Sequence, residues 1–533
     1  MMKKASASAS ASASASASAS ASAFEWEVEV GFQSDTPVVG VEFIPSVHVN
    51  YKGSHLSPPA TSYTLEVFWH REQNNILGST NSDDSRKANN NTCVKVSSSR
   101  IYVPSEDDIG RRLLLVLYAK DDEGMQKCST KIFFTSPVIQ RPRPCPRNML
   151  VFCSLDRLLR NPNARRPFKD GDFKVLSYNI LADLYNKREL YGRRGCPAWA
   201  LTWEYRRKNL LEEMLSYDAD VLCLQEVQSD HFNNFFQPEF EKFGYSVIYK
   251  KKTNEVYDGK QYLIDGCAIF FKKDRFKMVV KYEVEYGKMA LPLIEKIEPE
   301  RRNEGIFRLM KDNVAVVAIL EGKDQQRICV ANTHIHRGAS DASDVRLFQV
   351  VNLIRGLEKI DASGIPVLVC GDMNSVPGSD PHRFLVNGAV GRYPPNSKNK
   401  DPFGMYKHLK LSHSMNLASA YSELPNAEEV ESGTLDYILY SENRLKVEGL
   451  LKPLDLDSDS KKGKKRLPIP SSLWSSDHVA LMANFRIRKA FRGLKCLPPP
   501  ADPWEQPKSS HRQQYSDNMS KIQDSRFLIT SAC

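Results

Sequence analysis

The sequence VLVCGDMNS, residues 367–375, is an apolar run that an acid and an amide follow directly. Residues 365–370 are typical of a short buried strand, and Asp372 and Asn374 stand at its end. Upstream, apolar residues recur at helical spacing, at Leu347, Val350, Val351, Ile354 and Leu357. This spacing predicts one face of a helix. A helix that leads into a buried strand indicates an α/β domain, which we expect over residues 168–488.

Polar residues follow apolar runs at further places in the same part of the chain. They are Asn179 in FKVLSYNILAD, Glu226 in ADVLCLQEV, His334 in VANTHIH, and Asp477 with His478 in WSSDHVAL. Any one of them is most often a turn former, a helix cap or a histidine with a structural role. The set carries more weight, because several strand ends at one sheet edge can converge on one pocket.

These residue types suit the hydrolysis of a phosphodiester. That reaction needs a cation to neutralise the phosphoryl oxygens, a group that positions the attacking water, and donors for the developing negative charge. Oxygen ligands suit Mg²⁺. The 11 cysteines are scattered and include no C-x-x-C pair, which argues against a zinc site.

Together with a further motif, GTLDY at residues 433–437, these motifs resemble the exonuclease/endonuclease/phosphatase superfamily in order and spacing. Within it, CPAWALTWEYRRKNLLEEM at residues 196–214, then LQEVQSDHF and DGCAIFFKKDRF, resemble the carbon catabolite repressor protein four deadenylases, in their plant form without leucine-rich repeats. The resemblance covers about residues 168–485. It implies a two-sheet α/β sandwich, the DNase I-like nuclease fold, with the site at one end of the sheets.

The resemblance also implies a role for the polar residue in each motif. Glu226 would bind Mg²⁺, for which Mn²⁺ can substitute, with support from Asn179 and Asp477. Asp372 would orient or deprotonate the attacking water. Substrate contacts would come from Asn179, Asn374 and His334, the last donating to a phosphoryl oxygen.

The same resemblance assigns the leaving-group side of the reaction. His478 would stabilise the transition-state charge or protonate the leaving group, and Asp436 would fix its tautomer through the second ring nitrogen. Asp372, His478, His334, Asn374 and Asp436 are thus the expected catalytic residues.

The function implied is a Mg²⁺-dependent 3′–5′ exoribonuclease that shortens poly(A) tails and releases 5′-AMP, as a catalytic subunit of the Ccr-Not complex. Residues 429–432 read EVES where relatives carry an adenine-stacking aromatic residue, and residues 337–340 read RGAS where relatives tend to have a proline. We therefore expect the nuclease chemistry to be retained and the adenine preference to be weaker. The alternatives are a related phosphohydrolase acting on a nucleotide or phosphoinositide, and a catalytically weak scaffold.

The remaining chain predicts four further segments. Residues 1–23 are an Ala/Ser repeat expected to be disordered. Six β-rich runs over residues 24–138 predict an immunoglobulin-like β-sandwich, and residues 139–167 form a basic, proline-rich linker. Residues 489–533 have few apolar side chains and are expected to be a disordered tail.

Bulk composition restricts the partner and the location. Lys and Arg number 74 against 64 for Asp and Glu, and the net charge of +10 favours a polyanionic partner without identifying it. The apolar runs are far shorter than the roughly 20 residues that span a bilayer, so no membrane is expected. The cysteines are odd in number and scattered along the sequence, which suggests a reducing compartment. We expect the protein in the cytoplasm and the nucleus.

Overall fold

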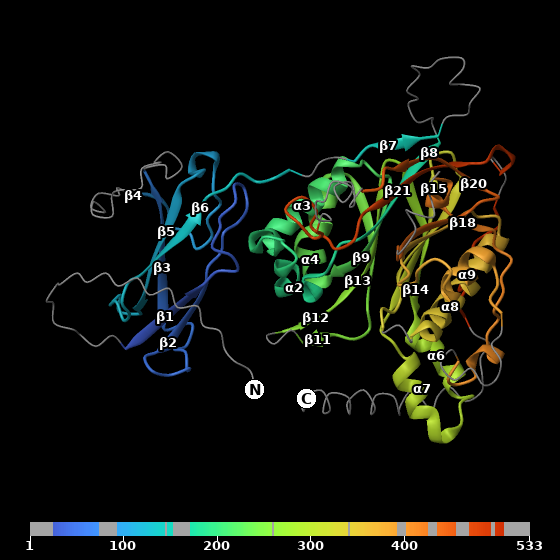
Figure 1. Ribbon diagram of the computed structural model, residues 1–533, viewed down its shortest axis with the longest axis horizontal. Coiled ribbons are helices and arrows are strands. Elements are labelled where there is room, and N and C mark those ends of the chain that lie inside the picture. Colours follow the sequence, from blue (N-terminus) through green and yellow to red (C-terminus); the bar gives the residue numbers. More distant parts are fainter. Residues whose placement is uncertain are drawn as a thin grey trace, which may run out of the picture. The chain divides into compact units, whose positions relative to one another are not determined.

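The computed structural model describes residues 25–73, 93–143, 147–152, 171–257, 261–338, 342–391, 401–424, 434–454, 468–491 and 496–505. The chain divides into two compact units, residues 1–141 and residues 142–533 (Figure 1). The Ala/Ser repeat and residues 506–533 lie outside the described residues.

The first unit is all-β, as predicted. Its strands are β1 (Trp26–Gly31), β2 (Ser46–Tyr51), β3 (Tyr63–Glu72), β4 (Cys93–Ser97), β5 (Arg112–Asp121) and β6 (Lys131–Pro137). β1 pairs with β2, and the others form a sheet in the order β4-β3-β5-β6. Every second residue of β5 from Leu113 to Ala119 is fully buried, and Trp69 packs in the same core. This alternation is typical of a sheet with one face against a core.

A buried carboxylate, Asp108, holds Tyr102 in this unit. Tyr102 donates its hydroxyl to Asp108 Oδ2 at 2.8 Å, and the same oxygen accepts the Ser105 backbone N–H at 2.7 Å. Strand β4 ends at Ser97, and Tyr102 pairs with Phe43 in an isolated bridge.

The second unit holds two large mixed sheets. The first has the order β10-β13-β9-β8-β21-β20-β7, with β7 (Met149–Val151), β8 (Asp172–Asn179), β9 (Val221–Gln228), β10 (Tyr245–Lys251), β13 (Asp265–Lys272), β20 (Leu445–Leu451) and β21 (Leu481–Ile487). The second has the order β14-β15-β16-β17-β19-β18, with β14 (Phe276–Glu285), β15 (Val314–Gly322), β16 (Arg327–His334), β17 (Val367–Asp372), β18 (Leu417–Ser419) and β19 (Asp436–Ser441).

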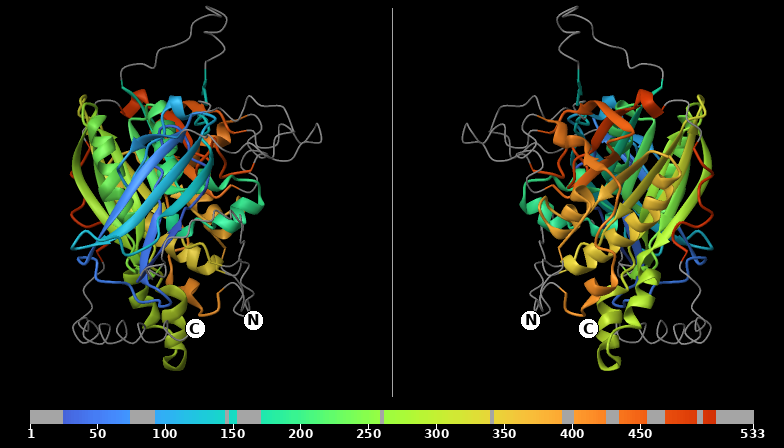
Figure 2. Two further views of the ribbon diagram at one scale, coloured as in Figure 1. Left: turned by 90° about the vertical axis from the view of Figure 1, so that its left-hand side faces the viewer. Right: turned by 90° about the vertical axis from the view of Figure 1, so that its right-hand side faces the viewer.

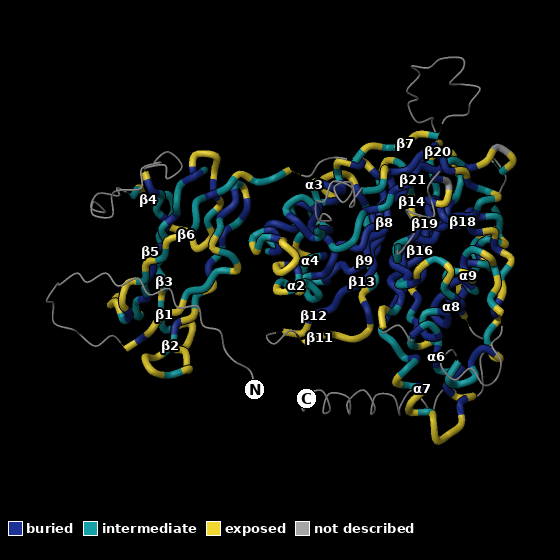
Figure 3. The backbone as a smooth tube through the Cα atoms, in the orientation of Figure 1, coloured by how far each residue is buried: buried dark blue, intermediate teal, exposed yellow. Residues whose placement is uncertain are grey.

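Three apolar cores stack these elements into the predicted α/β sandwich. One core lies between the two sheets, and in Figure 3 the strands there are mostly buried. A second joins the first sheet to α3 (Trp203–Ser216) and α5 (Gln237–Lys242). A third joins the second sheet to α6 (Tyr286–Ile294), α7 (Arg302–Leu309), α8 (Ser343–Ala362) and α9 (Asp380–Asn387).

Strand β9 shows why these sequences read as unbroken apolar runs. Val221 and Cys223 point into the core between the sheets, while Leu222 and Leu224 point toward α3 and α5. Successive side chains of a strand alternate between faces, so a strand covered on both sides is apolar throughout.

Two insertions flank the edge at which β9 and β16 end. The hairpin β11 (Val256–Tyr257) and β12 (Tyr262–Leu263) lies between β10 and β13, and α6 and α7 lie between β14 and β15. Figure 2 shows α6 and α7, in yellow-green, extending past one end of the sheets.

The structure corrects two predicted boundaries of the catalytic domain. Residues 149–151 of the expected linker form β7, which pairs with β20. Residues 496–505 of the expected tail pack on α8, where Trp504 is buried and donates its Nε1–H to the Asn352 carbonyl at 3.0 Å. Few apolar residues surround Trp504 in the sequence, but the core that it joins is supplied by distant elements.

Candidate active site

The second sheet brings three of the expected residues to one edge. β16 and β17 are parallel and end together, so that His334 is the register partner of Asp372. β19 is antiparallel to β17 and therefore begins at the same edge, where Asp436 is the register partner of Asp372. Gly371 permits this close pairing, because it has a φ of 147° and a Cβ there would overlap the Thr333 carbonyl oxygen.

The first sheet contributes from the matching edge. β8 ends at Asn179, which is paired with Gln225 on the parallel strand β9. β21 is antiparallel to β8, and Asp477 and His478 lie just before it. The expected polar residues therefore lie close together because of strand direction and register in both sheets.

Glu226 owes its direction to an irregularity in β9. The register between β9 and β13 shifts between Gly266 and Ala268, opposite Glu226, whose φ is 56°. Such a backbone costs about 1–3 kcal/mol and is often found at functional sites. The carboxylate accepts from Asn179 Nδ2 and from the Ala182 backbone N–H, each at 3.0 Å. Burial raises the pKa of Glu226, and the charge of nearby Asp265 adds to this.

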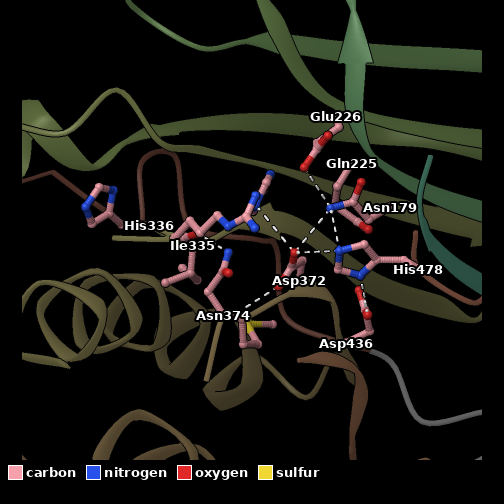
Figure 4. Close-up of polar contacts among 12 residues, drawn as sticks. Asn179, Gln225, Glu226, Ile335, His336, Asp372, Asn374, Asp436 and His478 are labelled. Carbon is pink, nitrogen blue, oxygen red and sulfur yellow. Dashed lines mark hydrogen bonds and ion pairs between the residues drawn. The ribbon is translucent and has the colours of Figure 1, made fainter. Parts of the chain in front are cut away.

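The Asn179 amide links the two sheets, as Figure 4 shows. Its Nδ2 atom lies 3.0 Å from Glu226 Oε1 in its own sheet and 3.2 Å from Asp372 Oδ2 in the other. His478 Nε2 is 3.5 Å from the same nitrogen. Asn179 is fully buried, so these contacts are shielded from bulk water.

Asp372 lies at the centre of the group. Its Oδ1 accepts the Asn374 backbone N–H at 2.9 Å, and its Oδ2 is 3.5 Å from His334 Nε2. Burial, and then the neighbouring Asp436 carboxylate, raise the pKa of Asp372 to about 7. Burial lowers the pKa of His334 well below its usual value, so this imidazole is neutral near pH 7.

His478 is held by a carboxylate through one ring nitrogen. Its Nδ1 lies 2.7 Å from Asp436 Oδ2, and its Nε2 lies 3.7 Å from Asp372 Oδ2. Burial by itself lowers the pKa of His478, but Asp436 outweighs burial and raises that pKa well above its usual value. The ring therefore keeps a proton that it can donate.

Asn374 belongs to the same group, and one hydrogen of its amide is already bonded within the chain. It has a φ of 46°, and its Nδ2 donates to the Ile335 carbonyl oxygen at 2.8 Å. An amide nitrogen has two hydrogens, so one donor is left for a substrate oxygen.

The oxygen atoms of this centre fit a hard divalent cation. Glu226 and Asp372 both have a raised pKa, since burial and other carboxylates oppose their ionisation. A divalent cation relieves such repulsion, and its preferred ligands are oxygens. Asp477, which also raises the pKa of Glu226, accepts a hydrogen bond from the Tyr191 hydroxyl at 2.8 Å.

A different group satisfies a simple distance criterion for a metal site. Among the described residues, ligand atoms of Asp372, Asp436 and His478 lie within 4.8 Å of one another. We do not assign the cation there, because His478 Nδ1 and Asp436 are already joined by a short hydrogen bond. The substrate-loop residues 339–340 and 429–433 lie outside the described residues.

Residues 176–478 match the Endonuclease/Exonuclease/phosphatase family. This interval runs from β8 to His478 and so includes each of the polar residues described above. The chain belongs to this family. The protein named Carbon catabolite repressor protein 4 homolog 1 of Arabidopsis thaliana is 42% identical over 438 residues, which are 75% of this chain and 71% of that protein. This relative confirms the resemblance seen in the motifs.

Two further relatives carry names that state different activities. CCR4-Not complex 3'-5'-exoribonuclease subunit Ccr4 of Mycosarcoma maydis is 33% identical, over 66% of this chain and 56% of its own. The crystal structure of ANGEL2, a 2',3'-cyclic phosphatase, in complex with adenosine-2',3'-vanadate is 30% identical, covers 59% of this chain and 96% of that chain, and has a TM-score of 0.46.

Sequence reasoning assigned no role at this edge to a buried cation, Lys252. Its Nζ lies 2.9 Å from Asp265 Oδ2 and 3.3 Å from the Tyr185 hydroxyl. Its charge lowers the pKa of both Glu226 and His334, which places it beside the site. The sequence reads KKK at residues 250–252, and only the fold shows which lysine turns inward.

Arg206 also positions backbone segments at this edge. It is fully buried and donates to the Ile180, Leu181 and Ser475 carbonyl oxygens and to Asp183. It thereby ties the segment after Asn179 to the segment before Asp477.

No helix among the described residues is long and apolar enough to cross a membrane.

Proposed function

We propose that this family member is a Mg²⁺-dependent 3′–5′ exoribonuclease that shortens mRNA poly(A) tails and releases 5′-AMP. The observation that carries the proposal is the joined group of Glu226, Asn179, Asp372, His478 and Asp436 at one sheet edge. Relatives named carbon catabolite repressor protein 4 and 3'-5'-exoribonuclease support the direction of attack and the RNA substrate.

The cation would be held by Glu226, with Asn179 and Asp477 in support. When bound, Mg²⁺, or Mn²⁺ in its place, supplies positive charge to the phosphoryl oxygens. The carboxylates around Glu226 support this assignment, since their mutual repulsion requires a compensating charge.

The chain's own groups divide the proton transfers. Asp372 would orient the attacking water and accept its proton, a role that a pKa of about 7 suits. His478, protonated because of Asp436, would donate from Nε2 to the leaving oxygen. Asn374 and neutral His334 would hold the phosphoryl oxygens, and Asn179 would share in substrate binding.

The RNA 3′ end is the proposed partner, and the name of the fungal relative supports a place in the Ccr4-Not complex. A function in mRNA turnover supports the cytoplasm and the nucleus as the proposed locations. The net charge of +10 is consistent with a polyanionic substrate.

A gel assay with 5′-labelled RNAs that end in A, C or U tests the function. We expect the A-tailed RNA to be shortened stepwise and fastest, with 5′-AMP as the product and no reaction in EDTA. Equal ladders from all three tails would reject poly(A) specificity. No ladder, with hydrolysis of a free nucleotide or a phosphoinositide instead, would favour the phosphohydrolase alternative, and no hydrolysis at all would favour a scaffold.

Matched variants assign the activity to the site. Glu226→Gln keeps the shape of the side chain and removes its charge, and it should lower turnover by orders of magnitude. Glu295→Gln makes the same chemical change at an exposed position and should leave turnover unchanged.

A further inference from the structure

A small cavity lies in the second unit among α8, α9 and residues 408–413, the region of the orange and yellow helices in Figure 1. Its volume is about 180 Å³. Apolar surface comes from Val351, Ile354, Phe384 and Leu409. None of the residues that line it belongs to the active site described above.

One basic side chain of this cavity, Arg355, has no partner in the described part of the chain. Its Nη2 is buried without a hydrogen bond, and no carboxylate forms an ion pair with it. Burial lowers the pKa of Arg355, since nothing compensates its charge. A buried donor that lacks an acceptor costs about 1–3 kcal/mol, and more when it is charged.

The one acidic residue in the lining does not supply that acceptor. Glu358 accepts from Lys410 Nζ at 2.9 Å through Oε2, and from the Ser414 backbone and hydroxyl at 2.9 and 2.8 Å through Oε1. Its charge is therefore balanced by Lys410. No other acid that the structure describes lines the cavity, whose further polar residues are Asn352, His408, Lys410, Ser412 and His413, so the cavity retains the positive charge of Arg355.

We propose that this cavity binds a small oxyanion, a phosphate or a carboxylate, through Arg355. The guanidinium presents N–H groups in a plane that matches two oxygens of such an anion. The volume accommodates a phosphate group but is below the roughly 300–1,000 Å³ of sites for larger ligands. The anion is therefore either free or the terminal group of a molecule that extends to solvent. The proposal goes beyond the proposed function and does not depend on it.

Calorimetric titration of the full chain with inorganic phosphate, acetate or 5′-AMP tests this site, with chloride used to keep the ionic strength constant. The active site also binds phosphates, so the titration is repeated with Asn374→Ala. We expect one saturable event that survives Asn374→Ala. Arg355→Gln should weaken it by about tenfold or more, because a hydrogen bond to a charged group is lost.

Control variants separate recognition from charge and folding. Lys359→Gln removes a positive charge from the exposed side of the same helix and should leave the affinity unchanged. Ser412→Glu places a carboxylate at the exposed rim and should abolish binding with Arg355 intact. Arg355→Lys, which retains the charge without the planar fork, serves if Arg355→Gln fails to fold.

The three anions distinguish the source of the ligand. Binding of phosphate and acetate indicates a free anion, whereas binding of 5′-AMP alone indicates the terminal phosphate of a larger molecule. Two outcomes would overturn the proposal. One is that no saturable event occurs in the Asn374→Ala background. The other is that the affinity is unchanged both by Ser412→Glu and by Arg355→Gln, or by Arg355→Lys where that variant replaces it.

Discussion

The Nδ1 atom of His478 lies 2.7 Å from Asp436 Oδ2, and this hydrogen bond joins one sheet of the catalytic unit to the other. His478 precedes β21 of the first sheet, while Asp436 begins β19 of the second. The other ring nitrogen faces Asp372 at 3.7 Å. The imidazole is thus held on one side and directed at the reacting centre on the other.

Asp436→Asn should lower the turnover number by about two to four orders of magnitude, because the proton of His478 and the orientation of its ring depend on this carboxylate. The pH profile should change as well. Without Asp436, burial lowers the pKa of His478, so activity should disappear at a lower pH than in the wild type. Initial rates between pH 5.5 and 9 measure both effects. An unaltered profile would show that Asp436 does not act through His478.

Glu226→Gln should raise the Mg²⁺ concentration that gives half-maximal activity by at least about tenfold, since even residues that only support metal ligands alter affinity this much. Titration of EDTA-treated protein with Mg²⁺ provides the measurement. Glu295→Gln should follow the wild-type curve. If both variants followed it, Glu226 would not be the metal ligand.

Lys252→Met should destabilise the fold by about 3–5 kcal/mol, because it leaves the buried Asp265 carboxylate without its partner. Lys252→Met with Asp265→Asn should recover much of that stability. Activity should stay low in the double variant if Lys252 also acts on Glu226 and His334. Denaturant unfolding and RNA cleavage are measured on the same samples. Full activity in the stable double variant would limit Lys252 to a structural role.

Gly356→Ala and Trp504→Ala should be strongly coupled, since a Cβ at Gly356 would overlap the Trp504 ring. Trp504→Ala alone should cost about 3–5 kcal/mol. Gly356→Ala should destabilise the wild type but stabilise the Trp504→Ala protein by up to about 1 kcal/mol, the usual advantage of alanine over glycine within a helix. A double-mutant cycle from urea unfolding measures the change of sign. Additive effects would show that residues 496–505 do not pack on α8 in solution.

Glu213 should make the stability of the catalytic unit depend on pH. Burial raises the pKa of this carboxyl to about 7, although the Tyr178 and Tyr217 hydroxyls donate to it. A raised folded-state pKa means that its contribution is fully present below the unfolded value near 4.5 and is lost as the pH rises through 7. Relative to Glu213→Gln, the wild type should therefore lose on the order of 3 kcal/mol between pH 4.5 and pH 8. Denaturant unfolding of both proteins at each pH measures this. A difference in unfolding free energy between the wild type and Glu213→Gln that is the same at every pH would contradict the prediction.

The sequence predicts those parts of the site that depend on strand ends. Residues 221–224 and 367–370 are apolar throughout because both faces of β9 and β17 are covered, and the polar residue that ends each run is visible for this reason. Strand direction then brings Asn179, Asp372 and His334 to the same edge.

Features that depend on long-range packing could not be predicted in this way. The left-handed backbone of Glu226 arises from a register shift against β13, which no local residue pattern reveals. Lys252 resembles its two lysine neighbours in sequence and differs from Lys251 only by its burial. Trp504 follows a proline-rich stretch without helical or strand periodicity, yet it packs on α8, which lies more than a hundred residues earlier in the sequence.

The Asn179 amide, which contacts Glu226 in one sheet and Asp372 in the other, also has a consequence during protein synthesis. Asn179 and Glu226 are translated early, whereas Asp477 and His478 are added some 250 residues after Glu226. A nascent chain that lacks this last segment has only part of the centre, and no imidazole bound to Asp436. Under the proposed assignment, the growing polypeptide therefore lacks its proton donor and stays inactive toward RNA until residues 477–478 have been added.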